Sequence, residues 1–144
     1  MICNMPILLV EDDPVDALAI KRAVQDLHLK ASLTHVVCAR DAIAHLRSAQ
    51  NDKPGLILLD LHMPDTDGLE FLQVLKNDPA LTDIPVVALT GSDAPRDVLK
   101  SFDLGIAGYM VKSTQYKDLL ETIRTIQDYW SLSQSPVHRV ESVG

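Results

Sequence analysis

The stretch Leu56-Ile57-Leu58-Leu59-Asp60 decides how this chain folds. Four consecutive aliphatic residues, entered from Pro54-Gly55, are typical of a short strand that is buried on both faces, as strands of parallel sheets are. We expect this strand to end at Asp60. A carboxylate is costly inside an apolar core, but at the C-terminal edge of a parallel sheet it lies where α/β proteins build their sites. Asp60 is therefore the candidate reactive group.

Strand and helix patterns alternate on either side of this stretch. Aliphatic runs predict strands over residues 6–10, 33–37, 84–89 and 107–111, and apolar spacings predict helices over residues 14–28, 41–46, 67–77, 93–103 and 114–131. Because each parallel crossover needs a helix on one face of the sheet, the alternation predicts an α/β fold with a doubly wound, five-stranded parallel sheet. We expect one domain over residues 1–131. Residues 132–144 lack periodicity and are predicted to form a flexible tail.

The composition limits the classes of function. A chain of 144 residues with 47% hydrophobic content is sized for one domain with a substantial core. Its 20 acidic and 13 basic residues give a formal net charge of −7, which argues against a nucleic-acid-binding surface and favours metal ions or cationic partners. No apolar run approaches the roughly 18 residues that span a bilayer, and Cys3 and Cys38 lack metal-ligand spacing. We expect a soluble, cytoplasmic protein with reduced thiols.

Polar side chains follow the ends of four predicted strands, namely Glu11-Asp12-Asp13, Asp60, Thr90 and Lys112. If all strands run the same way, these residues gather at one edge of the sheet. Carboxylates that converge repel one another, and a hard divalent cation such as Mg²⁺ is the usual remedy. A carboxylate beside such a cation can attack a phosphoryl group, while an ammonium and a hydroxyl neutralise the phosphoryl oxygens. Asp60, Lys112 and Thr90 suit these three roles.

At these residues the chain resembles the receiver domain of response regulators in two-component signalling, over roughly residues 5–131. The resemblance is carried by the motifs Val10-Glu11-Asp12, Asp60 with Met63-Pro64 and Asp67-Gly68, Ala88-Leu89-Thr90-Gly91, and Gly108-Tyr109-Met110-Val111-Lys112. It implies a flavodoxin-like (βα)5 fold with strand order 2-1-3-4-5, the order for which the chemotaxis receiver is a standard example.

The resemblance also implies roles for individual residues. Asp60 would accept a phosphoryl group from a sensor histidine kinase. Asp12, Asp60 and the backbone carbonyl of His62 would bind Mg²⁺, and Glu11 would do so through water. Thr90 and Tyr109 would form the switch pair that couples phosphorylation to the surface of the last two helices. Such a receiver is modified once and returns slowly, so we do not expect an enzyme with steady turnover of a small substrate.

One position departs from the family pattern. Members usually carry proline after the lysine, in a cis peptide, whereas this chain has Lys112-Ser113. A non-proline cis bond costs about 3 kcal/mol, so either the strain is kept or the peptide is trans and Lys112 approaches differently. The Lys-Ser pair, together with Tyr129-Trp130, is similar to single-domain regulators that work with bacterial phytochrome kinases.

Simpler interpretations exist for each residue taken alone. Asp13 is better explained as a helix N-cap than as a ligand. Thr90 alone fits a strand end, Tyr109 a half-buried aromatic and Lys112 a solvated charge. A hydrolase with an aspartate nucleophile would need a general acid two residues further on, where this chain has His62. A pseudo-receiver that never takes phosphate is the other alternative, which the intact acidic set argues against.

The last predicted helix also indicates a homodimer. Its apolar stripe comprises Tyr116, Leu119, Leu120, Ile123, Ile126 and Trp130. A helix of about 18 residues is roughly 27 Å long and overhangs a strand of about 17 Å, which leaves Tyr129 and Trp130 without a core of their own. We expect the dimer to form through the fourth and fifth helices and the fifth strand, with Tyr116, Ile126, Tyr129 and Trp130 at the interface. The alternative is that the tail covers Trp130.

Since we expect no DNA-binding domain after residue 131, output would pass by protein contact or by competition for phosphate.

Overall fold

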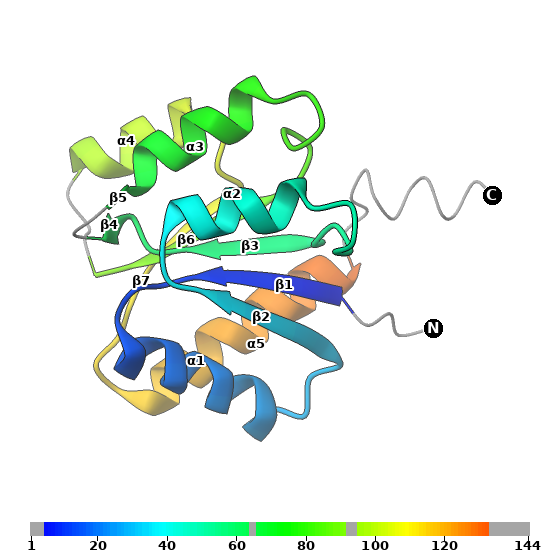
Figure 1. Cartoon of the computed structure of the whole chain (residues 1–144). Helices are drawn as coiled ribbons and strands as arrows, with labels where there is room; N and C mark the ends of the chain where they lie inside the picture. Colours follow the sequence, from blue (N-terminus) through cyan, green and yellow to red (C-terminus); the bar gives the residue numbers. More distant parts are fainter. Residues whose placement is uncertain (1–4, 64–65, 92–94, 133–144) are drawn as a thin grey trace.

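A five-stranded parallel sheet forms the centre of the structure, a computed structural model that describes residues 5–63, 66–91 and 95–132 (Figure 1). Its strands lie in the order β2-β1-β3-β6-β7, and they are β1 (Met5–Val10), β2 (Ala31–Val36), β3 (Leu56–Leu59), β6 (Val86–Thr90) and β7 (Gly108–Val111). All neighbouring strands in this sheet pair in parallel. The predicted α/β class and the 2-1-3-4-5 order are confirmed.

Helices cover both faces of this sheet. Helices α1 (Pro14–Asp26) and α5 (Tyr116–Leu132) lie on one face, and α2 (Ala39–Arg47), α3 (Gly68–Asn77) and α4 (Pro95–Asp103) lie on the other (Figure 1). Each face has its own apolar cluster, because successive side chains of a strand point to opposite sides. Leu58 of β3, for example, packs on the α1 side, whereas Leu59 packs on the α3 side. All four residues of β3 are buried, as the aliphatic run predicted.

Helix α1 begins where the sequence predicted. Asp13 is its N-cap and accepts a hydrogen bond of 2.9 Å from the backbone N–H of Val15, while Pro14 occupies the first turn. The side chain of Asp13 is thereby used to start the helix. The carboxylates of Glu11 and Asp12 do not cap the helix and lie at the edge of the sheet.

Some boundaries differ from the predicted ones. Strand β2 begins at Ala31, and α2 begins at Ala39, two residues each before the predicted starts. A two-stranded antiparallel hairpin, β4 (His62–Met63) with β5 (Thr66–Asp67), follows β3 and was not predicted, because two-residue strands are too short to show a period. The predicted flexible tail lies outside the described residues from residue 133 onward.

Gly68 begins α3 directly against the chain that follows β3. A Cβ atom at this position would lie 2.6 Å from Cα of Leu61 and 3.1 Å from the carbonyl oxygen of Asp60. A hydrogen at this position allows the first turn of α3 to contact the loop that carries Asp60.

Cys38 is a free thiol at the N-terminus of α2, and Cys3 lies outside the described residues. Within the part of the chain that the structure describes, no helix combines the length and the apolar character needed to cross a membrane.

Candidate metal centre at the sheet edge

The sheet hydrogen bonding continues one residue beyond three of the strands, and this places the site residues. The backbone N–H of Glu11 donates to a carbonyl of β2 at 3.1 Å, that of Asp60 donates to a carbonyl of β1 at 3.0 Å, and that of Lys112 donates to a carbonyl of β6 at 2.7 Å. The main chain of each residue is therefore fixed by the neighbouring strand. The predicted gathering of strand ends at one edge is confirmed.

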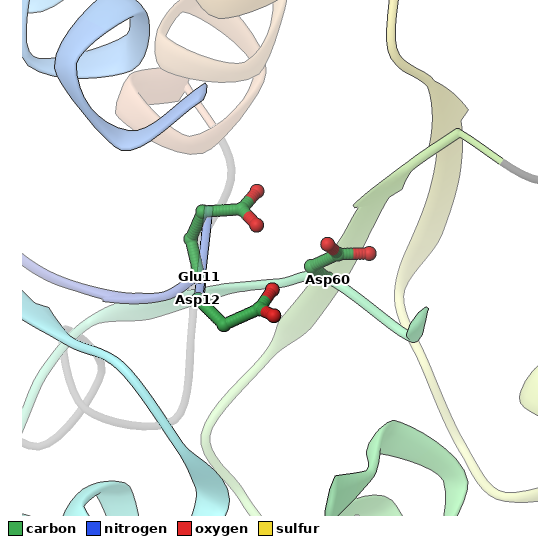
Figure 2. A group of neighbouring side chains, drawn as sticks. All are labelled: Glu11, Asp12 and Asp60. Atoms are coloured by element: carbon green, nitrogen blue, oxygen red, sulfur yellow. The ribbon is translucent and has the colours of Figure 1, made fainter. Parts of the chain in front are cut away.

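Three carboxylates meet at this edge. Oxygens of Glu11, Asp12 and Asp60 lie within 4.8 Å of one another, with Glu11 and Asp12 extending from the end of β1 and Asp60 from the end of β3 (Figure 2). Glu11 is 1% exposed and Asp60 is 6% exposed. Buried carboxylates at this spacing repel one another, and their hard oxygens are the ligands that small divalent cations prefer. The donor set fits a divalent metal ion.

The ionisation of Glu11 reflects this crowding. The pKa of Glu11 is raised from its ordinary value of 4.5 to about 8, mainly because the side chain is buried. The hydrogen bond to Lys112 and its positive charge lower this pKa, whereas the hydrogen bond and the negative charge of Asp60 raise it. Without a cation, this raised pKa favours the protonated form of Glu11. A cation that binds here has to displace that proton.

Lys112 contacts three carboxylates, two of which belong to this acidic cluster. Its Nζ atom lies 2.6 Å from Glu11 Oε1, 2.7 Å from Asp16 Oδ2 and 3.2 Å from Asp60 Oδ2. Burial lowers the pKa of Lys112, but hydrogen bonds to Asp16 and Glu11 outweigh it and raise that pKa overall. The Lys112–Ser113 peptide is trans, and Lys112 nevertheless reaches Asp60. Of the two possibilities left open by Ser113, the structure has the trans one.

Thr90 holds the other oxygen of the candidate phosphoacceptor. Its hydroxyl donates a hydrogen bond of 3.0 Å to Asp60 Oδ1, and Thr90 is fully buried. Tyr109 lies on β7, opposite Ala88 of β6, and is half-buried against the apolar cluster on the α3 side. Thr90 and Tyr109 thus lie on adjacent strands, with Thr90 paired to Val111 two residues beyond Tyr109.

Two residues near the site were not singled out by the sequence. His35 of β2 donates from Nε2 to the backbone carbonyl of Glu11 at 2.7 Å, which requires a proton on Nε2 and satisfies the carbonyl of the residue that follows β1. Asp16, in the first turn of α1, pairs with Lys112. An acid in a first turn is ordinary because it faces the positive end of the helix dipole, so the sequence carried no signal of this contact.

Not all predicted site and interface residues lie where they were expected. Ile126 is 3% exposed and belongs to the core on the α1 side, so its prediction as an interface residue is wrong. The hydroxyl of Tyr116 donates to Asp26 of α1 at 2.6 Å, which directs this ring toward α1 within the same chain. The apolar stripe of α5 packs against the sheet. Only the end of the helix, with Tyr129 and Trp130, is left as a candidate for the interface. Tyr129 is 59% exposed, and the side chains of Trp130 and His62 lie outside the described residues.

Fold and site together define a receiver domain. The sequence matches the family described as "Response regulator receiver domain" over residues 7–124, and the chain belongs to this family. Phosphorylation on an aspartate with Mg²⁺ is typical of its members.

Several individual members of this family are similar to the chain over most of its length. Response regulator Rcp1 of Synechocystis sp. is 37% identical over 132 residues, covering 86% of this chain and 87% of the relative. The probable methanogenesis regulatory protein FilR2 of Methanothrix harundinacea is 33% identical over 127 residues, covering 86% of this chain and 82% of the relative. Among solved structures, the phosphorylated cyanobacterial phytochrome response regulator RcpA superimposes with a TM-score of 0.87 at 34% identity, covering 93% and 99% of the two chains. The Mn²⁺-bound form of Rcp1 gives a TM-score of 0.83 at 34% identity, covering 92% and 99%.

Proposed function

We propose that this protein receives a phosphoryl group on Asp60 from a sensor histidine kinase, with Mg²⁺ bound by Asp12 and Asp60 and, through water, by Glu11. The observation that carries the proposal is the convergence of these carboxylates within 4.8 Å. A further Mg²⁺ ligand is the backbone carbonyl of His62, two residues beyond Asp60. The relative Rcp1 has been solved with Mn²⁺ bound, which supports a divalent cation at a site of this kind.

The chain's own residues account for the transfer. An oxygen of Asp60 forms a bond to phosphorus while the phosphorus–nitrogen bond of a phosphohistidine donor breaks, which gives an acyl phosphate and a free imidazole on the kinase. Lys112 and Thr90, which already hold the two oxygens of Asp60, are placed to donate to the incoming phosphoryl oxygens. Bound Mg²⁺ offsets the negative charge that accumulates there. Thr90 and Tyr109, on adjacent strands, then relay the change toward α4 and α5.

We further propose that the kinase is a phytochrome. The support is the likeness to RcpA, a phytochrome response regulator, over 93% of this chain and at 34% identity. The bacteriophytochrome response regulator AtBRR is also similar, with a TM-score of 0.72 at 31% identity. Residues 1–131 then form the receiver, and its signal passes to other proteins by contact in the cytoplasm.

A homodimer through α4, β7 and α5 is part of the same proposal. Large apolar side chains are exposed on these three elements, namely Leu99 (68%), Phe102 (50%), Val111 (47%) and Tyr129 (59%). Large exposed apolar side chains are candidates for an interaction surface. These residues replace Ile126 and Tyr116 as the anchors of the proposed interface.

Intact-mass measurement after incubation with acetyl phosphate and Mg²⁺ tests the central claim. We expect one added phosphoryl group on the native chain and none on Asp60→Asn. Asp83→Asn, an exposed acid that precedes β6 at the opposite end of the sheet, is the matched control and should be modified normally. Addition to Asp60→Asn, or no addition to the native chain with acetyl phosphate or a phosphorylated phytochrome kinase, would remove the claim.

A further inference from the structure

We infer that Asp16 is a positioning residue, which holds the Lys112 ammonium against Asp60 and thereby sets the rate of phosphoryl transfer. The inference rests on the proposed function of Asp60. Asp16 Oδ2 lies 2.7 Å from Lys112 Nζ, although the two residues are 96 positions apart in the sequence. An ammonium has three hydrogens to donate, and Glu11, Asp16 and Asp60 each accept one.

Of the three contacts of Lys112, only the one with Asp16 involves a carboxylate that neither belongs to the proposed metal site nor becomes phosphorylated. Glu11 and Asp60 belong to the acidic cluster, so a bound cation draws on both, and Asp60 also becomes the acyl phosphate. Asp16 lies outside that cluster, on the first turn of α1. During the reaction it is therefore the carboxylate that keeps its charge and its place beside Lys112.

The surrounding protein covers most but not all of Lys112, whose side chain is 16% exposed. Strand β7 is an edge strand of the sheet, and its last residue, Val111, is 47% exposed. A cavity of about 50 Å³ lies beside the lysine and is lined by Asp16, Lys112 and Ser113, among others. A lysine side chain is long and flexible, so next to open space it needs a polar partner to hold one position. Asp16 is the partner that reaches it from α1.

A purely structural role for Asp16 makes a different prediction. An acid in the first turn stabilises its helix through the helix dipole, and Asp16 would then act on α1 whether or not Lys112 were present. Asp26, at the other end of α1, offers a control because it too bonds to a distant segment, accepting from the hydroxyl of Tyr116 at the start of α5. Unlike Asp16, it has no contact with Lys112 in the described structure.

The decisive experiment compares Asp16→Asn, Asp16→Glu and Asp26→Asn in the native and the Lys112→Ala backgrounds. The phosphorylation rate is followed by intact mass with acetyl phosphate at saturating Mg²⁺. We expect Asp16→Asn to slow the native chain roughly tenfold, within the range that misplacement of one reacting group produces, and Asp16→Glu to recover part of the rate. Asp26→Asn should leave the rate unchanged. In the Lys112→Ala background, Asp16→Asn should have no further effect. A native rate in Asp16→Asn, or an equal slowing in both backgrounds, would overturn the inference.

A second measurement does not depend on phosphorylation. Reductive methylation with formaldehyde and cyanoborohydride as the hydride donor, read by peptide mass, reports how readily Lys112 leaves its carboxylates. We expect Lys112 to be labelled several-fold faster in Asp16→Asn than in the native chain or in Asp26→Asn. Unchanged labelling contradicts the inference about Asp16. If labelling accelerates but no chain is phosphorylated, the contact stands and the proposed function of Asp60 fails.

Discussion

The hydroxyl of Thr90 donates a hydrogen bond of 3.0 Å to Oδ1 of Asp60, and both residues are buried. Lys112 lies on the other oxygen, Oδ2, at 3.2 Å. The carboxylate is thus held at both oxygens by groups from two different strand ends. An orientation fixed in advance reduces the entropy that the transfer reaction has to lose.

Thr90→Val tests this hydrogen bond, because valine has the same shape and no donor. We expect the variant to lose about 1–3 kcal/mol of unfolding free energy, since a buried carboxylate oxygen loses its partner, and to be phosphorylated more slowly. Urea unfolding and intact-mass kinetics measure the two effects. Thr90→Ser keeps the hydroxyl and should retain most of the rate. If Thr90→Val behaves like Thr90→Ser, the hydroxyl has no part in holding Asp60.

Mg²⁺ should stabilise the fold by mass action. Free Mg²⁺ at 100 times its dissociation constant adds about 2.7 kcal/mol to the unfolding free energy. Asp12→Ala should abolish this gain and leave the metal-free fold intact or more stable, because one repelling carboxylate is removed. Thermal unfolding with Mg²⁺ or with a chelator measures both. The control Asp83→Ala should keep the full metal effect, and a full effect in Asp12→Ala would place the cation elsewhere.

The stability of the metal-free protein should fall as pH rises. The pKa of Glu11 is raised from 4.5 to about 8 in the folded chain, so the fold binds this proton more tightly than the unfolded chain does. The resulting stabilisation is complete below pH 4.5 and is lost as pH rises toward 8. Urea unfolding in chelator at pH 5.5, 7 and 8.5 should show this loss in the native chain. Glu11→Gln should lack it, and equal slopes in both chains would contradict the assignment.

Sedimentation at micromolar concentration tests the homodimer. We expect association that weakens in Phe102→Ala and Tyr129→Ala, because both remove exposed apolar area from the α4 and α5 face. Leu18→Ala removes a similarly exposed side chain from α1 and should have no effect. A chain that stays monomeric with and without the phosphoryl group would sink the dimer proposal.

Local signals in the sequence predicted the fold class, whereas the 2-1-3-4-5 strand order came from the resemblance to receiver domains. The aliphatic run of β3, the turn residues around it and the apolar spacing of the helices determine each element, and the rule that parallel strands end at one edge then places Asp60 beside Glu11 and Lys112. The Asp13 cap was predictable for the same reason, since it involves neighbours in the chain.

The contacts that the sequence did not predict connect distant segments or depend on what covers a surface. The pairs His35–Glu11 and Asp16–Lys112 join residues 24 and 96 positions apart. Neither His35 nor Asp16 differs from an ordinary surface residue in its local sequence pattern. Ile126 was assigned to an interface because a helical stripe shows which side of α5 is apolar. It does not show whether the sheet or a second chain covers that side.

The contact at Gly68 limits how the phosphorylated form can rearrange. Since a Cβ here would already lie 2.6 Å from Cα of Leu61, the start of α3 and the loop after Asp60 have no room to approach each other. We therefore expect the volume that the proposed phosphoryl group adds at Asp60 to be accommodated at β7, the outer strand of the described sheet. We expect the resulting movement to occur toward α4 and α5, because the start of α3 is already in close contact with the loop after Asp60.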